Sequence, residues 1–396
     1  MRVLVVNPGS ATLKCGLYQV SGPSVTALWT GVVDRVGTDT AVFRWQSGAT
    51  SGQTEVIAGD VSAALHQVLD SPGLTDGPDA AGCRVVHGGE RFTAPILVDA
   101  GVVEAIRALG VLAPLHNPVS ADVLQTIQDR LPDRPIVAVF DTAFHRTLPP
   151  VARAYALPYT LMEQHGLWRY GFHGIAHRNV MEQLRAHRQA CPARLITCHL
   201  GNGASVCAQR DGRSVETSMG LTPMEGLMMG TRSGDVDPGL VLHLQRAVGM
   251  SSAEVETLLN RESGLRGVSG VSNDLRDLER AAGAGDVRAE LAMQMFAYRA
   301  AKAIAAHTVA LGGVDAITFS GGIGENSATM RARVGELLAF LGVELDAGRN
   351  QQDDGARVRR ISTDASHVEV YVVRVDENAQ VAQETVRLLA SSTAEV

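Results

Sequence analysis

Short apolar runs that end in glycine-containing turns recur along the chain and predict buried β-strands. Residues 3–6 form the first run, the turn N-P-G-S follows at 7–10, and a second possible strand covers 13–20. Residues 136–140 are apolar throughout, which is typical of a parallel strand covered on both faces. Open α/β sheets bind ligands at the carboxyl ends of their strands, so Asp141, directly after this run, is a candidate site residue.

The second half of the chain repeats the pattern of the first. Residues 195–200 predict a strand, 201–205 a turn and 206–209 a returning strand, followed by a hairpin at Asp211-Gly212. This is a weak internal repeat of the unit at the start of the chain. The pattern alone is equally compatible with a duplicated unit and with two unrelated hairpins.

Helical periodicity separates these strands. Asp60 is expected to cap a helix that begins at Val61, and residues 286–311 predict one long helix. Its expected inward residues are Leu291, Met295, Tyr298, Ala301 and Ile304. Alternation of strands with helices indicates an α/β protein with mixed sheets.

The rest of the chain follows the same logic. A strand at 84–86 enters a glycine turn, another at 316–319 precedes a helix at 330–341, and a strand at 368–375 precedes a terminal helix. Residues 48–59 are rich in glycine, serine and threonine and predict a surface loop.

Length and charge narrow the class of protein. The 396 residues suggest two or three domains at about 150 residues each. The net charge of −7, with no run of five or six basic residues, argues against a nucleic-acid or anionic-membrane surface. No apolar stretch reaches the length of a membrane helix, the start does not resemble a signal peptide, and the five cysteines show no C-x-x-C spacing. We therefore expect a cytoplasmic protein.

Three turns could bind phosphate. The turns at 7–12, 201–205 and 321–326 each follow a strand, and consecutive backbone N–H groups in such turns bind phosphate oxygens. Each alone could be a structural turn, but three together favour a nucleotide polyphosphate. No P-loop, G-x-G-x-x-G or G-x-S-x-G motif occurs, which disfavours P-loop enzymes, dinucleotide-binding dehydrogenases and serine hydrolases.

Several charged side chains could act on such a ligand. Arg84 and Arg232 can bind carboxylate and phosphoryl oxygens, while Asp141 and Glu377 could hold Mg²⁺ or cap helices. His173 suits donation to an anion or a core position. Its spacing of four from His177 also allows zinc, but the neighbouring Gly174 and the missing glutamate make that the weaker interpretation.

Nine segments, taken together, resemble the acetate kinase family. They are N-P-G-S-A-T-L-K (7–14), R-V-V-H-G-G-E (84–90), P-L-H-N-P (114–118), F-D-T-A-F-H (140–145), G-F-H-G (171–174), H-L-G-N-G (199–203), M-G-T-R-S-G-D (229–235), S-N-D-L-R-D (272–277) and G-G-I-G-E-N (321–326). They stand in the family's order over almost the whole chain.

The resemblance implies a fold and an activity. The fold would be the duplicated, two-domain actin-like or ribonuclease-H-like α/β fold of sugar kinases, actin and heat-shock ATPases, with a central nucleotide cleft. Residues 1–148 with 376–396 would form the N-terminal domain, and 149–375 the C-terminal domain with the adenosine site and dimer interface. The implied enzyme is a homodimer that uses Mg²⁺, or Mn²⁺, to interconvert ATP and acetate with ADP and acetyl phosphate.

The resemblance also implies residue roles. Arg84, Asp141, His173 and Arg232 would be catalytic. Arg84, Val86, Leu115, His116, Phe172 and Pro223 would bind the acid. The nucleotide would contact Lys14, His199, Gly201, Asn202, Gly203, Asp274, Leu275, Arg276, Gly322, Ile323, Gly324 and Asn326, with Asn7 and Glu377 organising the metal.

The chain departs from the family pattern at five positions, and alternative functions remain. Pro8, Ala11, Thr12, Ala176 and Asn378 stand where the family usually has other residues. Three alternatives remain. The first is a propionate kinase of the same fold, since one methylene changes the binding free energy by only about 1–3 kcal/mol. The others are an actin-like ATPase without a small-acid substrate, and a kinase that transfers the phosphoryl group through a phosphorylated enzyme with Glu377 as the acceptor.

Overall fold

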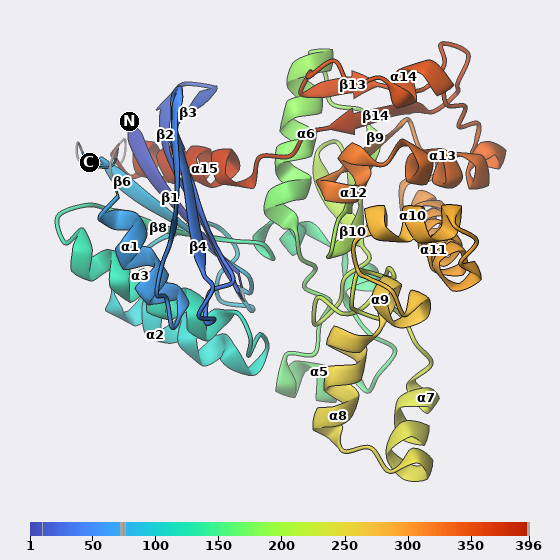
Figure 1. The fold of residues 1–396 in the computed structure, drawn as a ribbon, viewed down its shortest axis with the longest axis horizontal. Helices are drawn as coiled ribbons and strands as arrows, with labels where there is room; N and C mark the ends of the chain where they lie inside the picture. Colours follow the sequence, from blue (N-terminus) through green and yellow to red (C-terminus); the bar gives the residue numbers. More distant parts are fainter. Residues whose placement is uncertain (10, 72–73, 75–76, 394–396) are drawn as a thin grey trace. The chain divides into compact units, whose positions relative to one another are not determined.

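The computed structural model describes residues 1–9, 11–71, 74 and 77–393, so Ser10 of the first predicted turn lies outside the described residues. The chain divides into two compact units (Figure 1). Residues Met1–Phe144 and Asp376–Val396 form the N-terminal unit, and His145–Val375 form the C-terminal unit. A 3₁₀ turn, η2 (Ala143–Thr147), carries the chain from the first to the second.

The N-terminal unit is built on one mixed sheet in the order β5-β4-β3-β2-β1-β6-β8-β7. Its strands are β1 (Arg2–Pro8), β2 (Thr12–Ser21), β3 (Ser24–Asp34), β4 (Val42–Ser47), β5 (Thr50–Glu55), β6 (Ala80–Val85), β7 (Ile96–Leu97) and β8 (Ile136–Phe140). β1 pairs antiparallel with β2 and parallel with β6, and β6 pairs parallel with β8. The fully buried parallel strand expected at 136–140 is confirmed.

The loop prediction for residues 48–59 is wrong over Thr50–Glu55, which form the edge strand β5 paired with β4. Most of this strand is exposed. Because neither face of β5 is fully buried, its sequence shows no alternation of apolar and polar residues. Its backbone hydrogen bonds to β4 determine its conformation instead.

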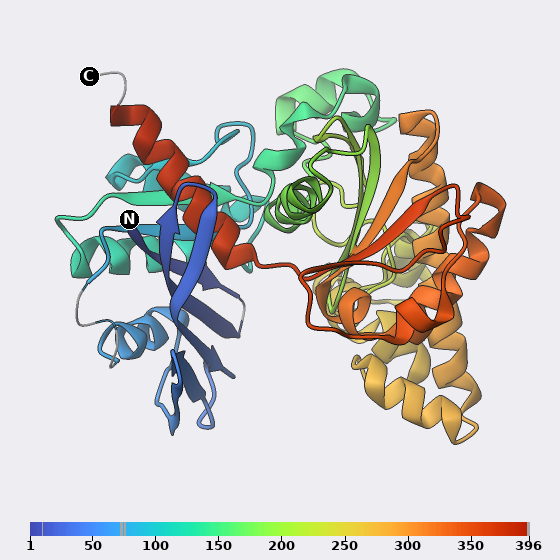
Figure 2. The ribbon, with the colours of Figure 1, turned by 90° about the horizontal axis from the view of Figure 1, so that it is seen from above.

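Helices pack on the N-terminal sheet. They are α1 (Val61–Leu69), α2 (Ala100–Ala108), α3 (Asn117–Arg130) and α15 (Glu377–Thr393), with a 3₁₀ turn η1 at Leu109–Val111. α1 begins as predicted, because the Asp60 carboxylate accepts a hydrogen bond from the N–H of Ala63 at 2.8 Å. α15 brings the end of the chain against β1 and β6 (Figure 2). Glu377 therefore reaches the strands that carry Asn7 and Arg84.

The C-terminal unit has a second mixed sheet in the order β11-β10-β9-β12-β14-β13. Its strands are β9 (Arg194–Leu200), β10 (Ala204–Arg210), β11 (Arg213–Thr217), β12 (Ala316–Ser320), β13 (Val358–Arg360) and β14 (Glu369–Val373). β9 pairs antiparallel with β10 and parallel with β12, and β12 pairs parallel with β14. The series β11-β10-β9-β12-β14 has the same pairing directions as β3-β2-β1-β6-β8, so the internal repeat is a duplicated unit.

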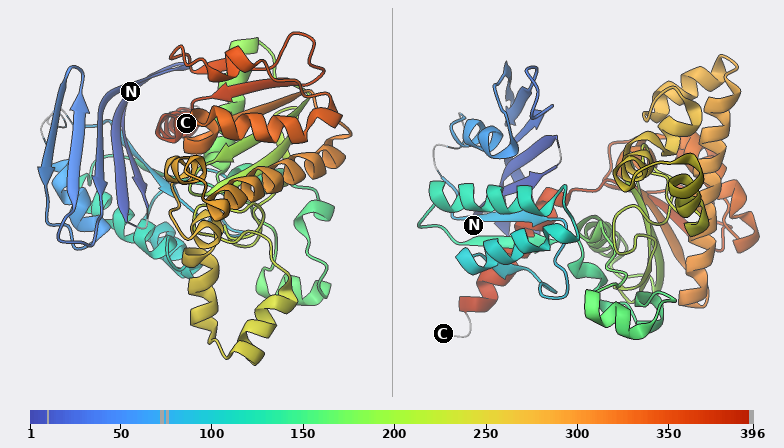
Figure 3. Two further views of the ribbon diagram at one scale, coloured as in Figure 1. Left: turned by 45° about the vertical axis from the view of Figure 1, so that its right-hand side comes forward. Right: turned by 90° about the horizontal axis from the view of Figure 1, so that it is seen from below.

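Helices cover both faces of this second sheet. α6 (Gly174–Arg188) packs against β9 and β14, while the long helix α11 (Val287–Leu311, orange in Figure 3) packs against β10 and β9 on the other side. The remaining helices are α4 (Pro150–Arg153), α5 (Tyr159–His165), α7 (Pro238–His243), α8 (Ser252–Thr257), α9 (Gly264–Ser269), α10 (Leu275–Gly283), α12 (Gly321–Asn326), α13 (Ala328–Leu337) and α14 (Ala347–Gln351). Short π-helices follow α7 and α8, at Leu244–Val248 and Leu258–Glu262.

The predicted inward face of α11 is partly wrong. Ala301 and Ile304 are buried as expected, but Leu291 and Tyr298 are 48% and 54% exposed. Met293 and Phe296 are buried instead. A helix turns by about 100° per residue, so moving the assumed inward face by one or two residues places different side chains in the core. Alanine at many positions of α11 gives little contrast between its buried and exposed faces, so the sequence does not determine which face points inward.

The predicted helix at 330–341 ends earlier than expected. α13 stops at Leu337, and a 3₁₀ turn, η5 (Ala339–Leu341), completes the segment. The predicted glycine turn at 321–326 is the short helix α12. The first difference concerns a helix end, where sequence patterns are least informative. The second is a helix of only six residues with three glycines, which is too short and too glycine-rich to show helical periodicity.

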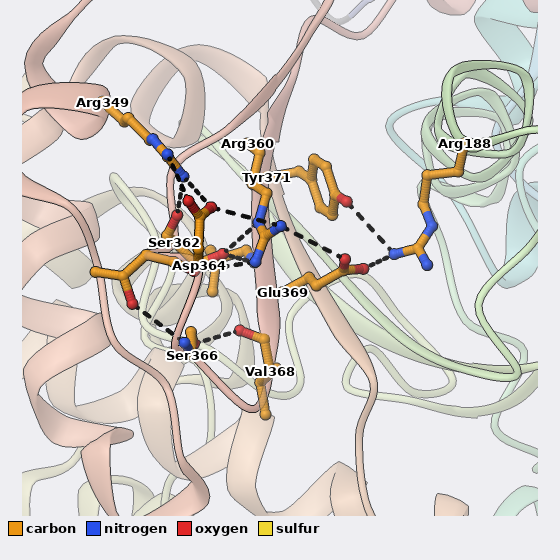
Figure 4. Close-up of polar contacts among 11 residues, drawn as sticks. Arg188, Arg349, Arg360, Ser362, Asp364, Ser366, Val368, Glu369 and Tyr371 are labelled. Carbon is orange, nitrogen blue, oxygen red and sulfur yellow. Dashed lines mark hydrogen bonds and ion pairs between the residues drawn. The ribbon is translucent and has the colours of Figure 1, made fainter.

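Ion pairs connect the segments around the outer strand β13 of the C-terminal sheet (Figure 4). Arg349 binds Asp364 at 2.9 Å, Arg360 lies 3.9 Å from Glu369, and Arg188 pairs with Glu369 from α6. Such partly exposed pairs contribute little stability each. These pairs connect α6 and α14 to β13, to β14 and to the segment between those two strands.

All five cysteines are free thiols. Among the described residues, no helix combines the length and apolar character needed to cross a membrane.

Candidate active site

A buried ion pair lies at the ends of two parallel strands of the N-terminal unit. Arg84, in β6, binds Asp141, directly after β8, through Nε and Nη2 to Oδ2 at 3.1 and 2.6 Å. Asp141 is 1% exposed. Burial raises the pKa of its carboxyl group, and the guanidinium of Arg84 opposes that rise. The carboxylate therefore fixes the orientation of the arginine.

Asn7 connects this pair to the start of α15. Its Oδ1 accepts a hydrogen bond from Arg84 Nη1 at 3.2 Å, and its Nδ2 donates to Glu377 Oε2 at 3.4 Å and Asn378 Oδ1 at 3.2 Å. The structure thus brings together four predicted site residues from four distant segments, Asn7, Arg84, Asp141 and Glu377. Asn378, one of the departures from the family pattern, joins the cluster through its side-chain oxygen.

The oxygen donors of this cluster fit a hard cation. Mg²⁺ is typically held by one or two carboxylates together with substrate phosphates and water. This cluster contains two carboxylates, Glu377 hydrogen-bonded to Asn7 and Asp141 hydrogen-bonded to Arg84. Within the described part of the chain, no group of three or more His, Cys, Asp or Glu side chains is arranged to hold a metal. The residues suit a metal that arrives with its phosphate ligands.

A backbone clamp holds the segment after β6. Asn117, at the start of α3, accepts a hydrogen bond from the N–H of His87 at 3.1 Å and donates to the carbonyl of His87 at 2.8 Å.

Val86 is buried, whereas Leu115 is 43% exposed. His116 is the residue that precedes α3. Lys14 is the direct partner of Asn7 across the β1–β2 ladder.

His173 stands at the entry of α6 in a conformation that non-glycine residues seldom adopt. Its φ is 56°, in the left-handed region, and α6 begins at the next residue, Gly174. The Nδ1 of His173 is 3.0 Å from Ser205 Oγ, and its ring lies 4.8 Å from the ring of His199. Backbone strain of this kind is typical of functional sites, where the surrounding structure maintains it.

Arg232 approaches the same glycine turn as His173. A Cβ atom built on Gly203 would stand 3.3 Å from Arg232 Nη2 and 3.3 Å from His173 Nε2, so the two donors converge on this turn. Arg232 also donates to the carbonyl oxygen of Pro223. Burial lowers the pKa of its guanidinium, which remains cationic. Two groups that suit a phosphoryl anion are therefore placed together.

The turn after β9 is tied to the segment before α10. Asn202 accepts a hydrogen bond from Asn273 Nδ2 at 3.0 Å through its Oδ1. Next to Asn273, the Asp274 side chain caps α10 and binds Arg276, which lowers the pKa of Asp274 to about 2. Asn273 was not among the predicted site residues, although it lies inside the S-N-D-L-R-D segment.

The predicted nucleotide residues Gly322, Ile323, Gly324 and Asn326 lie in α12, which starts at the end of β12. Glu325 accepts hydrogen bonds from the N–H groups of Gly321 at 2.8 Å and Val375 at 3.1 Å. Glu325 was missed by sequence reasoning, because its role is a tertiary contact rather than a pattern. Leu275 is buried at the start of α10.

The predicted acid-binding residues belong to different units. Val86, Leu115 and His116 lie in the N-terminal unit, and Phe172 and Pro223 lie in the C-terminal unit. Phe172 is 1% exposed and precedes the strained His173.

The zinc interpretation of His173 and His177 finds no support in the geometry. His177 lies 2.7 Å from Thr197 Oγ1 through Nδ1 and 2.8 Å from Ser205 Oγ through Nε2, so hydroxyl groups occupy both of its nitrogens.

Comparison with known proteins identifies the family of this chain. The model of the acetokinase family matches residues 2–383. An acetate kinase of Arthrobacter sp. (strain FB24) is 46% identical over 401 residues, covering 99% of this chain and 100% of that protein. The crystal structure of Porphyromonas gingivalis acetate kinase is 38% identical with a TM-score of 0.90, covering 98% of this chain and 99% of that one. A propionate kinase from Francisella tularensis subsp. tularensis is 36% identical with a TM-score of 0.90 over the same shares. The chain belongs to the acetokinase family.

Proposed function

We propose that this chain is an acetate kinase, which transfers the terminal phosphoryl group of ATP to acetate and returns it in the reverse direction. The observation that carries the proposal is the convergence of Arg232 and His173 on the Gly203 turn of a family member. Acetate phosphorylation requires charge neutralisation and positioning more than proton removal, and this cluster supplies both.

Acetate needs no general base to become a nucleophile. A carboxylic acid with a pKa near that of glutamate, about 4.3, is already ionised at pH 7. One oxygen of acetate attacks the terminal phosphorus while the bond from that phosphorus to the bridging oxygen of ADP breaks. Asp141 then serves to hold Arg84, to which it is bonded at 2.6 Å, rather than to remove a proton.

The remaining residues take positioning roles in this proposal. Arg84 and Arg232 bind the carboxylate and phosphoryl oxygens, and His173 donates to the phosphoryl group. Asn7 and Glu377 organise Mg²⁺, which when bound would offset the charge of the phosphates. Asp274, Arg276 and α12 contact the nucleotide. The ordered contact of Asn202 with Asn273 supports this assignment, because it joins the phosphate turn to the adenosine segment.

The decisive experiment traps the acyl phosphate. The protein is supplied with MgATP and hydroxylamine together with acetate, propionate or butyrate, and the hydroxamate is measured. We expect hydroxamate with acetate at a rate that depends on Mg²⁺. If no acid yields hydroxamate above the control without acid, the kinase proposal is wrong and an actin-like ATPase becomes the better description.

Propionate is the second candidate acceptor. The acetate kinase and the propionate kinase named above have the same TM-score of 0.90 to this chain, so the fold does not separate them. The same assay decides: a higher kcat/KM for propionate than for acetate would reassign the substrate.

We further propose direct transfer, without a phosphorylated enzyme. The Glu377 carboxylate is engaged by Asn7 Nδ2. Incubation with ATP labelled in its terminal phosphate, in the absence of acetate, should leave the denatured protein unlabelled. Covalent label that disappears in Glu377→Gln would establish the phosphorylated-enzyme alternative.

The proposed assembly is a cytoplasmic homodimer. On α11, Leu291 and Tyr298 are 48% and 54% exposed, an apolar surface of the kind that subunit contacts bury. Free thiols at all five cysteines suit a reducing compartment. Light scattering on the purified protein tests the assembly, and a Leu291→Glu, Tyr298→Glu variant should be monomeric if α11 forms the contact.

A further inference from the structure

A series of buried polar side chains lies directly behind His173 in the C-terminal unit. Ser205, on β10, places its Oγ 3.0 Å from His173 Nδ1 and 2.8 Å from His177 Nε2. The other ring nitrogen of His177 lies 2.7 Å from Thr197 Oγ1, on β9. Ser205, His177 and Thr197 are at most 1% exposed. The roles proposed above use none of these three residues.

The donors and acceptors along this series can be assigned from its far end. Gln209 Nε2 donates to Thr197 Oγ1 at 2.9 Å. The single hydroxyl proton of Thr197 has two nearby acceptors, His177 Nδ1 at 2.7 Å and the carbonyl of Cys207 at 3.4 Å. If His177 Nδ1 donated to Thr197 instead, the buried hydroxyl proton would have only the carbonyl of Cys207 at 3.4 Å, beyond the usual O–H···O range of about 2.5–3.0 Å. Thr197 therefore donates to His177 Nδ1 across the 2.7 Å contact.

The remaining protons follow from this first assignment. Burial, and then the neighbouring His145, His199 and His307, lower the pKa of His177 well below its usual value, so its ring is neutral at pH 7. A neutral imidazole has one N–H, and with Nδ1 accepting from Thr197 that N–H is on Nε2. His177 therefore donates to Ser205, and Ser205 donates to His173 Nδ1.

We propose that Thr197, His177 and Ser205 are positioning residues that hold the proton of neutral His173 on Nε2. A Cβ on Gly203 would stand 3.3 Å from that nitrogen, so Nε2 is the ring atom directed at the phosphate turn. The inference deepens the proposed function and rests on it, because this proton is the one that His173 would donate to the phosphoryl group. The wrong tautomer would present a lone pair to an anion.

Thr318 supplies a matched control. It is the direct partner of Thr197 in the parallel pairing of β12 with β9, and it is also fully buried. Its hydroxyl has no hydrogen-bond partner among the described residues. Thr197→Val and Thr318→Val thus remove the same atom from adjacent positions of one sheet, and only the first breaks the series.

The experiment reads the tautomer directly. Protein labelled with ¹⁵N in its histidines is examined by NMR, with the His173 signals identified by their loss in His173→Gln. We expect a protonated Nε2 and an unprotonated Nδ1 at His173 in the wild-type protein and in Thr318→Val. Thr197→Val should show a mixture of tautomers, and its kcat for acyl phosphate formation should fall about 2- to 10-fold, which is what one net hydrogen bond is worth.

Ser205→Ala provides a second variant, in which His173 Nδ1 loses the Ser205 hydroxyl directly and the mixture should be larger. A wild-type His173 protonated on Nδ1 would overturn the inference, as would identical tautomer ratios in Thr197→Val and Thr318→Val. The NMR measurement needs no substrate. A tautomer change in Thr197→Val in a protein that phosphorylates no acid would therefore support the hydrogen-bond series while refuting the proposed function.

Discussion

The two units share the order and directions of five strands but place opposite kinds of chemistry beside the first hairpin of that series. In the N-terminal unit, the β1–β2 hairpin lies next to an ion pair, Arg84 with Asp141. In the C-terminal unit, the β9–β10 hairpin lies next to uncharged hydroxyl and imidazole groups around His177, and its cation, Arg232, donates to a carbonyl. The duplicated scaffold determines where the turns lie, and the side chains beside them determine what each turn can do.

This difference has a thermodynamic consequence. A buried ion pair is neutral only while both partners remain, so removing one leaves an uncompensated charge. An arginine that faces a carbonyl leaves no charge behind when it is removed. The two arginines should therefore be equally important for turnover and very unequal for stability.

The largest expected effect is that of Arg84→Ala. The variant leaves Asp141 buried without its cation, which should lower the free energy of unfolding by about 3–5 kcal/mol and abolish most activity. Urea titration followed by circular dichroism measures the first effect. Arg84→Ala combined with Asp141→Asn should recover much of the stability and none of the activity, and a failure to recover stability would mean that the ion pair is not its source.

Arg232→Ala should separate activity from stability. We expect kcat/KM for acyl phosphate formation to fall about 10²–10³-fold, the usual effect of losing one donor to a developing anion. The midpoint of thermal unfolding should remain that of the wild-type protein or rise, since burial of this cation is unfavourable. A large loss of stability would contradict the contrast between the two arginines.

Acidification should affect the C-terminal unit first. Burial lowers the pKa of His145 and His307 from 6.5 to about 4, so between these values the unfolded chain binds protons that the folded unit does not. Stability is therefore full above pH 6.5 and falls as the pH drops toward 4, by about 3 kcal/mol for each histidine. Hydrogen exchange at pH 7.5 and 5 should show weaker protection in β9–β12 at the lower pH, and His307→Asn should reduce this dependence. Equal weakening in both units would contradict it.

The smallest expected effect concerns the turn at residues 201–205, which we propose to bind phosphate. In Gly230→Ala, the new methyl group would clash with Asn202 Oδ1 and would displace that side chain from Asn273. We expect kcat to fall about 10-fold, since small misplacements of a phosphate-binding group are costly. Gly283→Ala, at a helical position with open space around it, is the control and should behave as the wild-type protein.

Local patterns were sufficient for the elements that are buried on regular faces. The strand at 136–140, the cap at Asp60 and the hairpin at 211–212 are all present. The exposed edge strand β5 was missed and the inward face of α11 was misplaced, because neither segment carries a strong contrast between buried and exposed positions.

The candidate site divides in the same way. Arg84, Asp141, His173 and Arg232 could be proposed from the sequence, because their residue types, their positions after strands or beside glycines, and the family motifs are all visible in the chain. Ser205, Thr197, Asn273 and Glu325 were not assigned roles, because each acts through one contact with a distant segment.

The sequence by itself determined the alternation of strands and helices, the hairpins of the duplicated unit and the resemblance to the family. Only the tertiary structure decided which side chains become partners: that Asp141 holds Arg84, that Asn7 joins it to Glu377, and that Thr197 reaches His173 through His177 and Ser205. The physical reason is that propensity and burial act over a few residues, whereas donor and acceptor pairs form between strands that the chain order separates by up to hundreds of positions.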